Sequence, residues 1–182
     1  MQKPIATFTL KDGREAEINF LSKKDSTREL NRFINALVEE EAPVIYGSRV
    51  SLKEEERWKK NELEGLRKGE RFLLLARVGG KLAGTSGARR GIGKSKENVS
   101  LGIALAKEFR GAGLGEKLLS IGIKLSEKFF RPRNIYLSVL ACNKPAYSMY
   151  KKLGFREFAR FPKWVIQRGE YVDQVFMKLE KQ

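Results

Sequence analysis

The segment between residues 99 and 129 constrains the fold of this chain more than any other part. Val99–Leu105 is a mostly apolar run with the length of a buried strand. A glycine-rich turn follows it, Arg110-Gly-Ala-Gly113-Leu-Gly115, and apolar residues then recur at helical spacing across Gly115–Phe129. We therefore expect a strand, a tight turn and a helix in direct succession.

A turn of this kind is a favourable place for a phosphate group. The first N–H groups of a helix have no partner within the helix and lie at the positive end of its dipole. Glycine lets an anion approach the backbone, and Arg110 adds a planar set of donors. The turn lacks the Lys-Ser/Thr pair of nucleoside triphosphate loops, and too few strand–helix units follow for a dinucleotide fold. Taken alone, it predicts either a phosphate or pyrophosphate site or a tight connection whose glycines pack helix on strand.

Two motifs together resemble the GNAT superfamily of acyl-CoA-dependent N-acyltransferases. The turn Arg110–Gly115 matches the family's pyrophosphate loop, Arg/Gln-x-x-Gly-x-Gly/Ala. The segment Asn143–Phe155 is similar to its second motif, Asn-x-x-Ala-x-x-x-Tyr-x-x-x-Gly-Phe. The order and separation of the motifs also match, and the resemblance covers residues 72–179. It implies an N-acetyltransferase that moves an acetyl group from acetyl-CoA to a primary amine by direct attack in a ternary complex.

The resemblance also implies roles for individual residues. The edge of the first strand, near Ile103 to Leu105, would pair with the pantetheine arm of CoA, and Asn143 would hydrogen-bond that arm. Asn143 also suits a plain helix cap. Tyr150 would be the general acid that protonates the departing thiolate. The cofactor-binding residues implied in this way are Ile103, Ala104, Leu105, Arg110, Gly111, Ala112, Gly113, Leu114, Gly115, Asn143 and Tyr150.

The general base departs from the usual pattern of the family. Ser100 and Ser138 occupy the two positions where relatives carry a glutamate, and a serine needs a base beside it to accept a proton. The remaining candidates are Glu97, just upstream, and Asp173 on the last expected strand. Each also suits an ordinary surface carboxylate, and a water chain needs neither. The sequence therefore leaves the base open.

The acceptor side is expected between the first two helices. Tyr46 and Trp58 would wall an amine pocket, and Glu54 would hold a cationic substrate. The alternative is helix packing for the aromatic residues and a capping box, Ser51-x-x-Glu54, for the glutamate. Small amines, free amino acids and protein N-termini all remain open as acceptors.

Composition adds a few limits. The 182 residues suit one domain, 1–182, and no apolar run has the length of a membrane span. A single cysteine excludes an internal disulfide and suits the cytoplasm, while the absence of histidine and of acidic metal-ligand spacing predicts no metal. The net charge of +15 suits CoA phosphates and a lysine- and glutamate-rich thermophile protein. It also motivates the alternative, a non-catalytic acyl-CoA-binding or RNA- or ribosome-associated module; a homodimer is compatible with either.

The remaining pattern predicts an α/β fold with a mixed sheet flanked by helices, mostly antiparallel with one splayed parallel pair, as the resemblance implies. The expected strands are 6–10, 15–20, 71–78, 81–88, 99–105, 135–140, 155–160 and 171–179. The expected helices start at Asp25 or Ser26, at the Ser51 capping box, at Gly115 and at Pro145.

Overall fold

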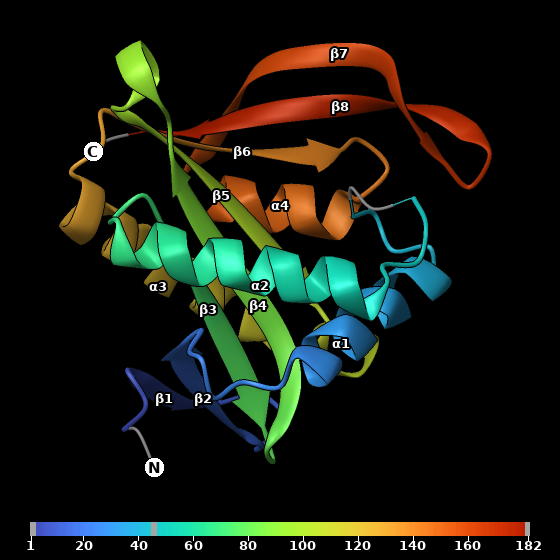
Figure 1. Ribbon diagram of the computed structural model, residues 1–182. Helices are drawn as coiled ribbons and strands as arrows, with labels where there is room; N and C mark the ends of the chain where they lie inside the picture. Colours follow the sequence, from blue (N-terminus) through green and yellow to red (C-terminus); the bar gives the residue numbers. More distant parts are fainter. Residues whose placement is uncertain (1–2, 45–46, 181–182) are drawn as a thin grey trace.

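The computed structural model describes residues 3–44 and 47–180 of the chain. The described residues form one sheet of eight strands in the order β1-β2-β3-β4-β5-β6-β8-β7. In chain order the strands are β1 (Ala6–Thr9), β2 (Glu15–Phe20), β3 (Arg71–Val78), β4 (Lys81–Arg90), β5 (Asn98–Leu105), β6 (Asn134–Leu140), β7 (Phe155–Gln167) and β8 (Glu170–Leu179). The helices are α1 (Thr27–Glu39), α2 (Leu52–Arg67), α3 (Leu114–Phe130) and α4 (Lys144–Lys152), as drawn in Figure 1.

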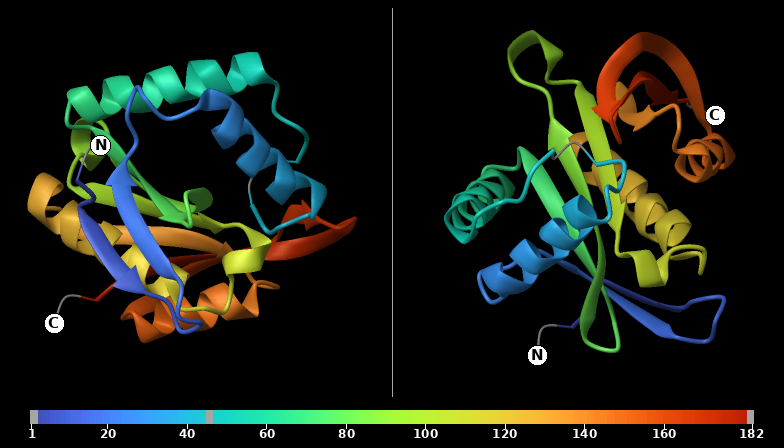
Figure 2. Two further views of the ribbon diagram at one scale, coloured as in Figure 1. Left: turned by 90° about the horizontal axis from the view of Figure 1, so that it is seen from below. Right: turned by 90° about the vertical axis from the view of Figure 1, so that its right-hand side faces the viewer.

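Strand β3 shows why helices cover both faces of the sheet. Side chains alternate between the two faces of a strand, and both sets are apolar here. Phe72 and Leu74 pack in the same core as Leu118 of α3, whereas Leu73 and Leu75 pack with residues of α1 and α2. Figure 2 shows α1 and α2 on one side of the sheet and α3 and α4 on the other. Strand β3 is therefore buried on both faces, as its apolar run 72–76 requires.

The helix starts follow local capping. Ser26 caps α1, since its side chain accepts a hydrogen bond from the Glu29 backbone N–H. Ser51 and Glu54 form the expected capping box at the start of α2, with both reciprocal hydrogen bonds present. Asp25, the other candidate cap, instead accepts hydrogen bonds from Ser22 and from Arg77.

The sheet contains one parallel pair, and that pair separates along its length. Strands β5 and β6 pair in parallel only at their starts, where Asn98, Val99 and Ser100 face Asn134, Ile135 and Tyr136. Beyond Ser100, β5 remains paired with β4 on its other side, through Leu105. The edge of β5 that faces β6 is thus free of strand partners from Leu101 onward. This is the expected mostly antiparallel α/β sheet with a splayed parallel pair, and the fold prediction is confirmed.

Strand β7 is longer than the sequence pattern predicts. The expected end was Arg160, but pairing with β8 continues to Gln167. Two register shifts interrupt the pairing, and the second spans Pro162 and Lys163, the latter with a φ of 51°. Because β7 is the outermost strand, a proline that lacks an N–H is tolerated in a bulge there. The long β7–β8 hairpin consequently forms a curved outer edge of the sheet (Figure 1).

Candidate active site

The separation of β5 and β6 opens into a cavity of about 910 Å³. Both strands line it, β5 through Leu101 to Ala104 and β6 through Ser138 to Leu140. Helices α1 and α2 supply a second wall, and the β7–β8 hairpin supplies a third through Trp164, Val165, Ile166, Tyr171 and Gln174. The cavity therefore joins the free edge of a strand to a largely apolar chamber between helices and hairpin.

Several residues that the sequence singled out meet in this cavity. Ile103 and Ala104 line it from β5, and Asn143 and Tyr150 line it from the start and the end of α4. Leu105, expected on the same edge, is not among the described lining residues; its carbonyl oxygen accepts hydrogen bonds from Arg110. Asn143 has its alternative role as well, because its Oδ1 caps α4 by accepting a hydrogen bond from the Ala146 N–H at 3.3 Å.

Tyr150 is held by packing rather than by polar contacts. Its side chain is 6% exposed, and its ring lies 6.1 Å from that of Phe155. No described residue hydrogen-bonds its hydroxyl, and burial raises the pKa of Tyr150 to about 12. A phenol with so high a pKa stays protonated at neutral pH, so the group facing the cavity is a hydrogen-bond donor.

The glycine-rich turn is separated from β5 by a short 3-10 helix (Lys107–Phe109) and forms the start of α3. Gly113 is the N-cap with a φ of 87°, and no side chain caps the first N–H groups of the helix. These N–H groups are therefore free to bind an anion. A Cβ at Gly115 would lie 3.1 Å from Leu105 Cδ1 and 3.2 Å from Met149 Sδ, so this glycine also permits close packing of helix on strand. The packing alternative drawn from the sequence is therefore present in this turn, and the phosphate-binding alternative stays a prediction.

The side chains of the other turn residues are either buried or held by contacts with the rest of the chain. Leu114 is fully buried and Ala112 is 9% exposed. The guanidinium of Arg110 forms an ion pair with Glu40 at the end of α1 and donates to the Leu105 carbonyl from Nη2 at 2.8 Å. Arg110 therefore ties α1 to the end of β5 in this structure, and Gly111, with a φ of 79°, continues the chain around the turn.

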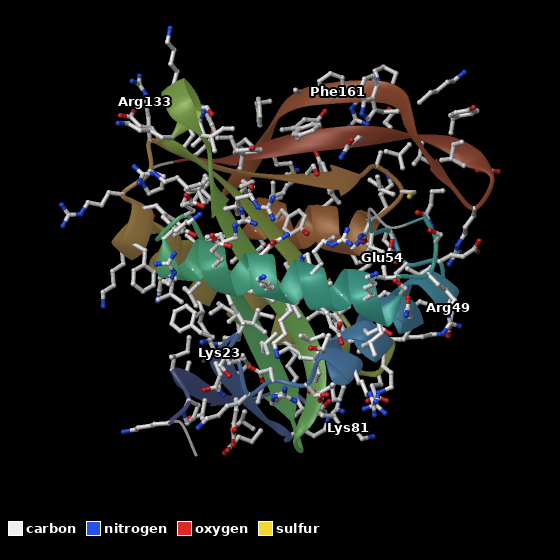
Figure 3. The ribbon with its side chains drawn as sticks, in the orientation of Figure 1. Lys23, Arg49, Glu54, Lys81, Arg133 and Phe161 are labelled. Carbon is white, nitrogen blue, oxygen red and sulfur yellow. The ribbon has the colours of Figure 1, made fainter. Side chains whose placement is uncertain are left out.

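Of the residues expected on the acceptor side, Trp58 lines the cavity and Glu54 does not. Trp58 lines the cavity, half-buried, together with Phe33 and Ile34 of α1. Glu54 is exposed and is absent from the described lining; its hydrogen bonds to Ser51 hold the pKa of this carboxyl below its usual value. Figure 3 shows Glu54 at the first turn of α2, with Arg49 toward the outer edge of the molecule. Tyr46 lies outside the described residues.

Neither sequence candidate for the base is among the described residues that line the cavity. Glu97 is exposed in the segment before β5. Asp173 accepts a hydrogen bond from the Lys163 N–H at 3.0 Å and pairs with Arg160 at 3.2 Å, and these contacts lower the pKa of its carboxyl. An acid held in its charged form by such partners is a weak proton acceptor. Their catalytic role stays a prediction that this geometry does not favour.

Glu55 is a cavity residue that no sequence pattern singled out. This side chain is 5% exposed and lines the cavity from α2, and burial raises the pKa of its carboxyl to about 7. The residue stands beside the conspicuous capping glutamate, in a run of three glutamates. The signal that identifies it is its position three residues before Trp58, which places both side chains on neighbouring turns of one helix face.

The described part of the chain contains no cluster of three or more acidic or cysteine side chains arranged to hold a metal ion. Within those same residues, no helix has the length and apolar character needed to span a membrane.

Solved structures share the fold across nearly the whole chain. A putative acetyltransferase from Salmonella typhimurium, yncA, solved with its cofactor acetyl-CoA, superposes with a TM-score of 0.79 at 20% identity, covering 91% of this chain and 93% of that one. A ribosomal-protein-alanine N-acetyltransferase from Brucella melitensis gives a TM-score of 0.76 at 22% identity, with coverage of 88% and 97%. At these identities the likeness concerns the fold.

Curated relatives match over a shorter part. An N-alpha-acetyltransferase of Sulfurisphaera tokodaii is 31% identical over 104 residues, which span 52% of this chain and 62% of the relative. The L-amino acid N-acetyltransferase AaaT of Escherichia coli is 32% identical over 79 residues, which span 43% and 49%. The chain thus matches about half to three fifths of the length of these relatives.

The family profile covers more of the chain and includes both motifs of the cavity region. Residues 32–155 match the acetyltransferase (GNAT) family, a range that begins in α1 and ends at Phe155, the last residue of the second motif. It contains the separated strands, the glycine-rich turn, Asn143 and Tyr150. The chain belongs to the acetyltransferase (GNAT) family.

Proposed function

We propose that this protein is an acetyl-CoA-dependent N-acetyltransferase whose acceptor is the α-amine of a peptide or protein that begins with an apolar residue. The observation that carries the proposal is the single cavity lined by the free edge of β5, by Asn143 and Tyr150, and by an apolar chamber with one carboxylate. Such a cavity accommodates a thioester at one end and an amine at the other.

The residues fit the cosubstrate in four places. The uncapped N–H groups at the start of α3, beyond Gly113, suit the pyrophosphate, and the free edge of β5 suits the amide-containing pantetheine arm. Bound acetyl-CoA supplies the activated acetyl group. Backbone N–H groups of Ile103 to Leu105 would stabilise the charge that develops on the thioester oxygen, and Tyr150 would donate a hydrogen bond to the departing sulfur. With a pKa of about 12, Tyr150 favours such donation over complete proton loss.

The cavity lining supports a particular class of acceptor. Among its described lining residues there is no lysine or arginine, so a free amino acid would leave its carboxylate without a counter-ion. An amine whose neighbouring carboxyl is an amide avoids that cost. The apolar wall of Leu30, Phe33 and Trp58 suits an apolar first side chain. Trp164, Ile166 and Tyr171 on the hairpin are exposed, and their apolar surface suits the residues that follow.

Other features extend the proposal. One sheet joins β1 to β8, which supports a single domain over residues 1–182. An exposed cysteine without a disulfide and the excess of lysine and glutamate agree with a cytoplasmic protein of a thermophile. A homodimer and a nucleic-acid partner stay predictions; RNA binding that weakens steeply with salt would support the latter.

A series of three acceptors tests the function and its acceptor class. We expect acetyl transfer to a peptide that begins with methionine and to methionine amide. For free methionine we expect kcat/KM to be lower by a factor of about ten or more, because the carboxylate of the free amino acid lacks a partner. Thiol release from acetyl-CoA gives the rate, and mass spectrometry identifies the acetylated product. Equal rates for methionine and its amide would contradict the acceptor class. No transfer to any acceptor by protein that binds acetyl-CoA would contradict the enzymatic function itself.

A further inference from the structure

The buried face of α2 carries charged residues where a helix that packs on a sheet usually carries apolar ones. Glu55, Lys59 and Glu62 are 5%, 9% and 7% exposed, respectively. Their spacing of four and three residues places them along one side of the helix. Burying a charged side chain costs free energy unless hydrogen bonds or an opposite charge compensate it. Each of the three therefore requires an explanation.

Two of the three have structural partners. Lys59 donates from Nζ to the backbone carbonyls of Lys23 and Asp25, and so joins α2 to the segment before α1. Glu62 accepts hydrogen bonds at 3.1 Å from both Arg71 and Arg89, on the neighbouring strands β3 and β4. These contacts explain why both charges are buried.

Glu55 has no such partner among the residues that the structure describes. No described residue forms a hydrogen bond or an ion pair with its carboxylate, which lies at the wall of the same cavity as Tyr150. Lys59 and Glu62 are engaged as above, and the other ionisable groups among the described lining residues are the phenols of Tyr150 and Tyr171. Burial therefore acts alone and raises the pKa of Glu55 to about 7.

We propose that Glu55 accepts the proton of the acceptor ammonium, which makes it the general base that neither Ser100 nor Ser138 can be. The inference rests on the proposed function and supplies its missing group. A carboxylate in an apolar chamber attracts the ammonium form of the amine into the cavity. The Glu55 carboxylate is also basic enough at neutral pH to remove a proton from that ammonium.

The acetyl transfer moves two protons off the nitrogen and exchanges one C–S bond for one C–N bond. The ammonium passes one proton to the Glu55 carboxylate, and the nitrogen lone pair attacks the thioester carbonyl carbon. The C–N bond forms and the C–S bond breaks, with its electron pair leaving on sulfur. The second proton lost by the nitrogen neutralises the thiolate through the Tyr150 hydroxyl or solvent, and Glu55 returns its proton to water.

The test is the pH profile of kcat/KM for the wild-type protein and for Glu55→Gln. A base must be deprotonated to act, so wild-type kcat/KM should rise with pH up to about 7. Because the ammonium form is the one drawn into the cavity, kcat/KM should fall again above the pKa of the acceptor amine itself. The rising limb should stay in place when a peptide is exchanged for an alkylamine, whose own pKa is about two and a half units higher. In Glu55→Gln we expect kcat about a hundredfold lower at neutral pH, and a limb that follows the ionisation of whichever amine is used.

Two further variants separate a chemical role from a structural one. Glu56→Gln makes the same change at the next residue, which is exposed, and should leave rate and profile unchanged. Glu55→Asp keeps a carboxylate and should keep the acceptor-independent limb at a reduced rate. Acetyl-CoA affinity should be the same in all four proteins, which shows that each is folded.

The outcomes distinguish this inference from the function on which it rests. An active wild-type protein whose Glu55→Gln variant keeps both its rate and its acceptor-independent limb would overturn the role of Glu55 alone. A wild-type protein that binds acetyl-CoA but acetylates no acceptor would overturn the proposed function, and the role of Glu55 with it.

Discussion

Replacing Tyr150 by phenylalanine is expected to lower kcat about ten- to a thousandfold while leaving the affinity for acetyl-CoA nearly unchanged. The substitution removes one hydroxyl and keeps the ring that packs against Phe155. A donor that acts on the departing sulfur stabilises the transition state more than the bound thioester, so its loss appears in kcat. Thiol-release kinetics and a separate binding measurement give the two quantities.

Tyr147→Phe is the matched control, because it also removes a tyrosine hydroxyl from α4. Tyr147 is not among the described cavity lining, and its hydroxyl lies 3.0 Å from Glu157 Oε2 on β7. Normal turnover in this variant is expected. If Tyr150→Phe instead weakened acetyl-CoA binding and left kcat intact, Tyr150 would be a packing residue.

Replacing Gly113 by valine is expected to weaken acetyl-CoA binding about ten- to a hundredfold, or about 1.4–3 kcal/mol. With a φ of 87°, Gly113 adopts a backbone conformation that a β-branched residue strongly disfavours. The change therefore distorts the start of α3 and puts a side chain where the pyrophosphate would approach the free N–H groups. Calorimetry with CoA measures the loss directly.

Gly69→Val controls for the backbone strain. Gly69 has a φ of 68°, has open space around its Cβ position and lies in the connection between α2 and β3. Both variants should lose stability by a similar amount in thermal unfolding, whereas only Gly113→Val should lose affinity for CoA. Equal CoA affinity in the two variants would contradict the assignment of the pyrophosphate site to this turn.

The individual helices and strands could be predicted because their signals are local, whereas the splayed parallel pair was expected from the family resemblance. The glycine-rich turn, the Ser51 capping box and the apolar strand β3 each depend on neighbouring residues and general backbone preferences. The end of β7 could not be predicted, because Pro162 is tolerated only through a bulge on an outermost strand. That position follows from sheet order, which residues distant in the sequence decide.

The candidate site was predictable on the cofactor side and hidden on the acceptor side. The motifs identify Asn143 and Tyr150, and both line the cavity. The partner of Arg110 is Glu40, 70 residues away in the chain, and no local pattern indicates it. Helix α2 is charged on nearly every side, so hydrophobic periodicity cannot identify its buried face. The sequence therefore favoured Glu54 for its capping pattern, although the buried carboxylate is that of Glu55.

A crystal structure of the protein with CoA and a peptide beginning with methionine would show whether cosubstrate and acceptor meet in this cavity. We expect the pyrophosphate at the N–H groups beyond Gly113 and the pantetheine arm along the free edge of β5. We also expect the thiol beside the Tyr150 hydroxyl and the peptide α-amine within hydrogen-bond distance of Glu55. Pantetheine bound away from the gap between β5 and β6, or an α-amine remote from Glu55 with Tyr150 facing no sulfur, would contradict this expectation.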